Sequence, residues 1–112
     1  MNDALTWEHR LQSELRQAET ARAAGNEGKS RVCARRAAGI IIGEFFQRRG
    51  GLQPGPSAYD RLKFLRQEPE ISPEIRAVAG HFLIRITPEH ELPVEVDLIA
   101  KARWLKTELL DR

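Results

Sequence analysis

The chain has 112 residues, of which 41% are hydrophobic and 30% are charged, and its formal net charge is +2. These values are typical of one globular domain and exclude an intrinsically disordered chain, so residues 1–112 are expected to form a single domain. The longest mainly apolar stretch, residues 37–46, is interrupted by Glu44 and is shorter than the about 20 residues that a membrane span needs. The charged N-terminal segment lacks a signal-peptide pattern, which predicts a cytoplasmic location.

The first predicted helix extends from about Asp3 to Ala24. Its apolar residues recur at spacings of three and four, which places them on one helix face. Gly25 is suited to end this helix, and Asn26 is a suitable N-cap for the next one. The apolar face consists of Ala4, Trp7, Leu11, Leu15, Ala18 and Ala21.

The second predicted helix covers residues 27–49 and stops at Gly50 and Gly51. Apolar residues occupy more than half of its circumference, so it is expected to be the central helix of the bundle or part of a subunit interface. The isoleucines at 40–42 alone would also suit a strand. The length of the segment and its periodic flanks favour a helix.

A loop rich in proline and glycine, residues 52–56, precedes a short third helix. Ser57 is predicted to cap this helix, because Asp60 follows it at the spacing of a capping box. Pro69 ends the helical pattern.

The fourth and fifth helices also have recognisable starts. Ser72 followed by Pro73 is a strong N-terminal signal for a helix that continues to about Ile84. Pro93 is predicted to open the last helix, whose apolar face ends near Leu109. The sequence therefore predicts an all-α fold, a compact bundle of about five helices in which two long antiparallel helices come first.

Arginines outnumber lysines by 14 to 4, and Arg31, Arg35 and Arg36 lie together on the second helix. One interpretation is a nucleic-acid-binding surface, with RNA as a possible ligand. The other is the polar edge of a buried helix, paired with carboxylates such as Asp97. No aromatic residues alternate with these arginines, which favours the structural interpretation.

Gly39 and Gly43 are spaced four residues apart on the same helix. Each glycine disfavours helix formation by about 1 kcal/mol relative to alanine, so their presence on one face indicates close approach of another backbone. The sequence leaves three partners open: the first helix, the same helix of a second subunit, or ordinary packing within the chain.

The three histidines, His9, His81 and His90, are widely separated, and Cys33 is the only cysteine. No histidine pair has the spacing of a helical zinc site, and a single thiol supports neither an internal disulfide nor a thiolate zinc site. Cys33 and His81 are predicted to be packing residues. We therefore expect no metal and no cofactor.

Arg85 and His90 are the remaining candidates for chemistry. They are separated by four residues in the segment that joins the fourth helix to the last one. An imidazole can transfer a proton during RNA cleavage while a guanidinium stabilises the charged phosphorane, so the pair is a candidate catalytic site.

The chain resembles the HEPN superfamily of small all-helical domains. The resemblance consists of two long antiparallel helices, the second with the run Arg31-Val32-Cys33-Ala34-Arg35-Arg36-Ala37-Ala38-Gly39, a shorter helical region, an Arg-x4-His element, and a last helix beginning near Val96-Asp97-Leu98-Ile99. It covers nearly the whole chain and implies a domain that often dimerises and works in toxin–antitoxin or defence systems. Some members are metal-independent ribonucleases that use the arginine and the histidine, and others are inactive partners of nucleotidyltransferases.

Two features separate this chain from the active members. Ile86 stands where those members have a polar residue after the arginine, and Pro88 breaks the helical turn that would orient both side chains. The favoured prediction is therefore an HEPN-like interaction domain without enzymatic activity, a homodimer or a partner of a protein such as a nucleotidyltransferase. The alternatives are a metal-independent ribonuclease with Arg85 and His90 as catalytic residues, and a DNA-binding regulator.

Overall fold

The computed structural model describes residues 6–50, 55–84 and 96–111, and these residues form an all-α structure. No strand occurs among them, which confirms the predicted fold class and the helical conformation of Ile40–Ile42. The helices are α1 (Trp7–Ala23), α2 (Glu27–Arg48), α3 (Ala58–Gln67), α4 (Pro73–Phe82) and α5 (Leu98–Leu110).

Each helix begins at a side chain that caps it. The side-chain oxygens of Asn26, Ser57 and Ser72 accept hydrogen bonds from the backbone N–H groups three residues further on, which confirms these predicted caps. Thr6 and Asp97 cap α1 and α5 in the same way. Local sequence therefore determines where the helices start.

The ends of three predicted helices are corrected by the structure. The predicted start of the last helix at Pro93 is wrong: Val96 and Asp97 are not helical, and α5 begins at Leu98 because the Asp97 carboxylate accepts a hydrogen bond from the Ala100 N–H. The fourth helix ends at Phe82 and not near Ile84, since the Leu83 N–H bonds to a carbonyl three residues back. The first helix begins at Trp7, because the backbone of the preceding residue, Thr6, is extended and not helical.

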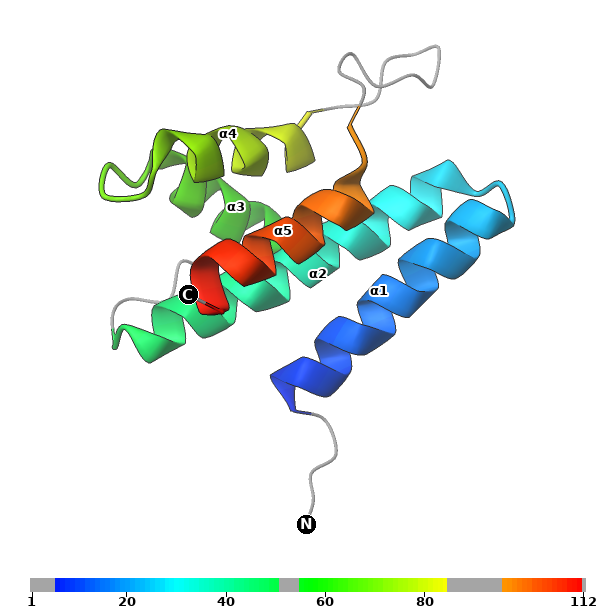
Figure 1. Cartoon of the computed structure of the whole chain (residues 1–112), viewed down its shortest axis with the longest axis horizontal. Helices are drawn as coiled ribbons and strands as arrows, with labels where there is room; N and C mark the ends of the chain where they lie inside the picture. The colour runs from blue at the N-terminus through cyan, green and yellow to red at the C-terminus, as the bar shows by residue number, and fades with distance from the viewer. Residues whose placement is uncertain (1–5, 51–54, 85–95, 112) are drawn as a thin grey trace.

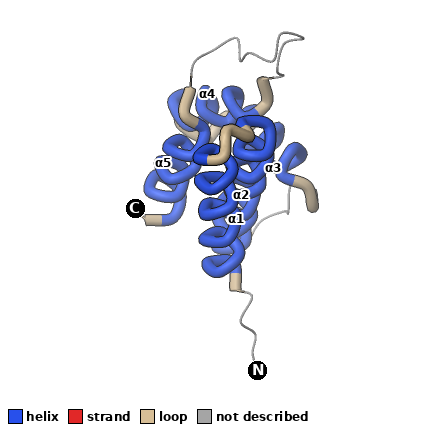
Figure 2. The backbone as a smooth tube through the Cα atoms, turned by 90° about the vertical axis from the view of Figure 1, so that its right-hand side faces the viewer, coloured by secondary structure: helices blue, strands red, loops and turns tan. Residues whose placement is uncertain are grey.

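The helix α2 is the centre of the structure. It packs against α1, α3 and α5, while α4 packs on α3 and α5 (Figure 1). Figure 2 shows α3 and α5 on opposite sides of the α1–α2 pair. Ile41 and Ile42 of α2 are fully buried, so its wide apolar surface is covered within one chain.

The element that packs closely against Gly39 and Gly43 of α2 is α3, and not the first helix or a second subunit. A Cβ on Gly39 would lie 2.7 Å from Cβ and 2.8 Å from Cα of Ala58, the first residue of α3. A Cβ on Gly43 would lie 2.5 Å from Nη1 of Arg61. Both glycines therefore make room for α3, which explains why a central helix tolerates their low helix propensity.

Substitution of these glycines should separate the two contacts. Gly39→Ala places a methyl group against backbone atoms, so α3 must shift, and we expect a net loss of about 1–3 kcal/mol in the free energy of unfolding. Gly43→Ala meets only the end of the Arg61 side chain and should cost less. Gly28→Ala, at an open position of α2, should be neutral or stabilise by up to about 1 kcal/mol. Urea denaturation measures all three; equal effects of Gly39→Ala and Gly28→Ala would contradict the α2–α3 contact.

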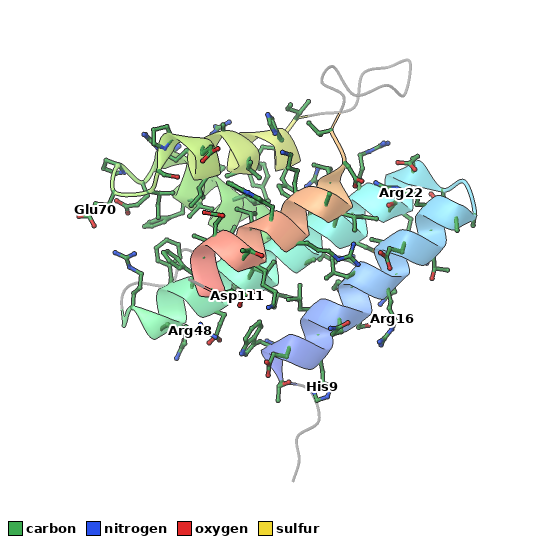
Figure 3. All side chains as sticks on the ribbon, in the orientation of Figure 1. His9, Arg16, Arg22, Arg48, Glu70 and Asp111 are labelled. Atoms are coloured by element: carbon green, nitrogen blue, oxygen red, sulfur yellow. The ribbon has the colours of Figure 1, made fainter. Side chains whose placement is uncertain are left out.

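Arginines connect the helix ends. Arg48 donates from Nη1 to the Leu110 carbonyl at the end of α5 (3.1 Å) and from Nε to Glu44 (2.9 Å), and its guanidinium lies 5.6 Å from the ring centre of Trp7 in α1. Arg22, at the other end of the α2–α5 pair in Figure 3, donates to Asp97 at 3.0 Å. One end of α5 is thus held by Arg48 and the other by Arg22.

Candidate functional site

Two adjoining hollows open where α3 begins against the α1–α2 pair. Their volumes are about 300 and 260 Å³, and Arg10, Ile40 and Arg61 line both. Arg36 lines the smaller hollow. We call the two hollows the arginine groove, defined by Arg10, Arg36 and Arg61. Three different helices thus contribute a guanidinium to one concave surface.

Arg61 is held in a fixed position in the arginine groove. Its Nε donates to the Gly55 carbonyl at 2.9 Å, and its Nη1 donates to the Gly39 carbonyl at 3.0 Å. Gly43 lies beside the guanidinium and leaves room for it. These two bonds occupy Nε and Nη1 of the guanidinium, and Nη2 makes no hydrogen bond with a described residue. Arg61 is therefore a preorganised donor for an anionic group.

Arg36 and Glu14 face the same hollow without pairing. Arg36 is exposed and makes no hydrogen bond or ion pair within the described part of the chain. The Oε1 atom of Glu14 is buried and has no hydrogen-bond partner. The hollow is thus lined by a guanidinium and a carboxylate that do not pair with each other.

Cys33 lies behind Glu14 in the core. Burial raises the pKa of the Cys33 thiol above its ordinary value near 9.0, and the negative charge of the neighbouring Glu14 carboxylate raises it further. A thiol that stays protonated is a poor nucleophile, so Cys33 is suited to packing and not to chemistry.

The predicted nucleic-acid-binding residues Arg31, Arg35 and Arg36 have three different environments. The Arg31 side chain is only 14% exposed and lies 3.9 Å from the Glu27 carboxylate. Arg35 donates from Nε to the Phe82 carbonyl at 3.1 Å and so caps the end of α4. Arg36 lines the arginine groove. The structure therefore places Arg36 with Arg10 and Arg61, which the sequence did not single out.

Arg85 and His90 lie outside the described residues. The chain on either side of them is anchored to the long helices: Phe82 by Arg35, and Asp97 by Arg22. Among the predicted carboxylate partners, Asp97 bonds to Arg22 of α1 and not to an arginine of α2. Asp97, which was expected to pair with an arginine of the second helix, thus connects α1 with α5 instead.

Asp97 combines a helix cap with an ion pair. Partial burial acts to raise its pKa, but the hydrogen bonds from the Ala100 N–H and from the Arg22 guanidinium outweigh this effect and lower the pKa of Asp97 below its ordinary value near 3.8. Because the folded pKa is depressed, the ionised carboxylate stabilises the fold above the unfolded pKa, and this contribution disappears as the pH falls through the folded pKa.

Two substitutions of Asp97 should separate the cap from the charge. Asp97→Ala removes both and should lower the free energy of unfolding at neutral pH by about 1 kcal/mol. Asp97→Asn retains a capping oxygen and should cost less. The difference between wild type and Asp97→Asn should begin to shrink near pH 4, where the carboxyl of the unfolded chain becomes protonated, and should disappear as the pH falls through the lower pKa of the folded chain. Urea denaturation at neutral and acidic pH measures this; a difference independent of pH would contradict the role of the charge.

The described residues do not supply other kinds of site. Within residues 6–50, 55–84 and 96–111, no group of histidine, cysteine and carboxylate side chains is arranged to hold a metal ion. No helix in the same ranges combines the length and apolar character needed to cross a membrane. Comparison of the chain with known protein families, with curated protein sequences and with solved structures finds no match.

Proposed function

We propose that this chain is an HEPN-like helical interaction domain that works through a protein partner, as in toxin–antitoxin or nucleotidyltransferase-partner systems. The observation that carries the proposal is the order and placement of the helices. Two long antiparallel helices form the base, the short α3 and α4 follow, and α5 returns along α2 after the Arg85-x4-His90 segment (Figure 1). The resemblance implies this same order.

The arginine groove supports an interaction role. It brings guanidiniums from α1, α2 and α3 to one surface, and Arg61 is fixed by two backbone carbonyls. Fixed arginines bind carboxylates and other oxyanions with a small loss of side-chain entropy. Most large apolar residues are buried in the core, so a partner is recognised mainly by polar and charged contacts.

The experiment is isolation of the tagged full chain from cells that express it naturally. A protein partner should co-elute in constant stoichiometry through size exclusion at about 0.15 M salt, an ionic strength that screens weak surface attraction. A nucleotidyltransferase encoded beside this chain is the first candidate to test by co-expression. Quantitative recovery of the chain alone from both preparations would contradict the proposal.

A homodimer is part of this proposal. Because α3 covers Gly39 and Gly43, a second subunit must use another surface. The large apolar residues exposed in the described ranges are Val32 of α2 (41%) and Tyr59 of α3 (53%). We expect a dimer in sedimentation velocity at micromolar concentration, and Val32→Glu should weaken it while Gly28→Ala should not. A chain that stays monomeric at all concentrations would remove the homodimer from the proposal.

The alternative is a metal-independent ribonuclease, favoured by the Arg85-x4-His90 motif. If Arg85 and His90 are catalytic, the chain should cleave single-stranded RNA in EDTA with a rate that depends on pH near the imidazole pKa of about 6.5. Arg85→Ala and His90→Ala should both remove this activity and leave the helical circular dichroism spectrum intact. Our proposal predicts no cleavage, because Ile86 and Pro88 disfavour a preorganised site. Cleavage lost in both variants would establish the ribonuclease instead.

The third possibility, a DNA-binding regulator with α3 and α4 as a helix-turn-helix, has the least support. The link between these helices contains the exposed Glu70, and Glu74 lies in the first turn of α4. Negative charges at this position would repel the phosphates that a recognition helix must approach.

A further inference from the structure

The charges of the arginine groove are not balanced. Arg36 and Arg61 line the smaller hollow without an ion pair to a described residue, and Glu14 is the one carboxylate among the described residues that line it. In the adjoining hollow, Glu44 is already paired with Arg48 at 2.9 Å. The groove therefore attracts an anion, with the Nη2 atom of Arg61 and the guanidinium of Arg36 as the donors that no described residue uses.

Further basic and polar residues lie along the α1–α2 pair, beyond the arginine groove. Lys29, Arg36 and Gly43 are spaced seven residues apart and so share one face of α2. A third hollow of about 420 Å³ lies at the Lys29 end of this face and is lined by Arg16 and by the hydroxyl and amide side chains of Ser13 and Gln17. This surface is elongated and basic, which suits an extended segment better than a compact ligand.

Glu14 restricts the chemistry of the ligand. Its carboxylate lines the same hollow as Arg36 and Arg61 and forms no ion pair with a described residue. A phosphate backbone offers only acceptors and negative charge, so it would be repelled by Glu14. A peptide offers N–H donors together with carboxylate side chains, and can satisfy Glu14 and the arginines at the same time.

We propose that the arginine groove binds an acidic peptide segment of a protein partner. Arg36 and Nη2 of Arg61 bind side-chain carboxylates of the segment, and the Glu14 carboxylate, which lines the same hollow, accepts a hydrogen bond from a backbone N–H. The inference rests on the proposed function, since it assigns the surface by which an interaction domain holds its partner.

The test uses a fluorescently labelled oligoglutamate peptide and an oligothymidylate of equal charge, titrated separately with the full chain and followed by anisotropy. Arg36→Ala should weaken peptide binding about tenfold, the effect of losing a hydrogen bond to a charged group. The matched control is Arg66→Ala, which removes the same charge from an exposed site at the end of α3 and should leave the affinity within about twofold. Thermal melting should show that both variants remain folded.

Glu14→Gln distinguishes the two classes of ligand by the size of its effect. It removes the same negative charge for both ligands, so oligothymidylate binding should become tighter. For the peptide it also weakens the acceptor of a backbone N–H, a loss of about threefold that offsets the gain, so peptide affinity should rise less than oligothymidylate affinity or fall. An equal loss of peptide affinity in Arg36→Ala and Arg66→Ala would overturn the arginine groove as the binding site, because binding would then depend only on net charge. Tighter binding of oligothymidylate than of peptide, with the same dependence on Arg36, would overturn the peptide in favour of a phosphate backbone. Neither outcome contradicts the proposed function, because that function is tested separately by co-elution of a natural partner.

Discussion

The close approach of α3 to α2 at Gly39 determines where α3 and its side chains lie. Without a side chain at Gly39, the first residue of α3 lies against the backbone of α2. This contact brings Arg61 over Gly43, where its guanidinium reaches the Gly39 and Gly55 carbonyls. The same packing that buries Leu62 and Leu65 therefore also fixes one wall of the arginine groove. Stability and the candidate site share one geometric cause.

The abundance of arginine has a physical explanation in the helix ends. The last carbonyls of a helix have no partner within it, and a guanidinium reaches them with several donors at once. Arg35 donates to the carbonyl of Phe82 at the end of α4, and Arg48 to that of Leu110 at the end of α5. A lysine ammonium lacks the planar fork that lets Arg48 bond to Glu44 in the same conformation.

The features that are local in sequence were predictable, and those that depend on long-range packing were not. Helix periodicity and the caps Asn26, Ser57 and Ser72 follow from neighbouring residues. Asp97 has the same capping chemistry, but Pro93 is itself a typical first residue of a helix, so the local sequence offers two possible starts. The convergence of Arg10, Arg36 and Arg61 could not be predicted from spacing, because it requires the α3 docking at Gly39. The paired glycines indicated a close contact but not its partner.

Arg36 and Glu14 are opposite charges that line one hollow, yet no ion pair joins them. Arg36 is exposed and hydrated, so its lack of an ion pair has little effect on stability. The buried Oε1 of Glu14 is shielded from water and has no hydrogen-bond partner among the described residues, and this costs free energy in the isolated chain. Local departures from full pairing of this kind are concentrated at functional sites, where a ligand supplies the missing partner. The unpaired donor and acceptor are thus a stronger indication of binding than the number of arginines in the groove.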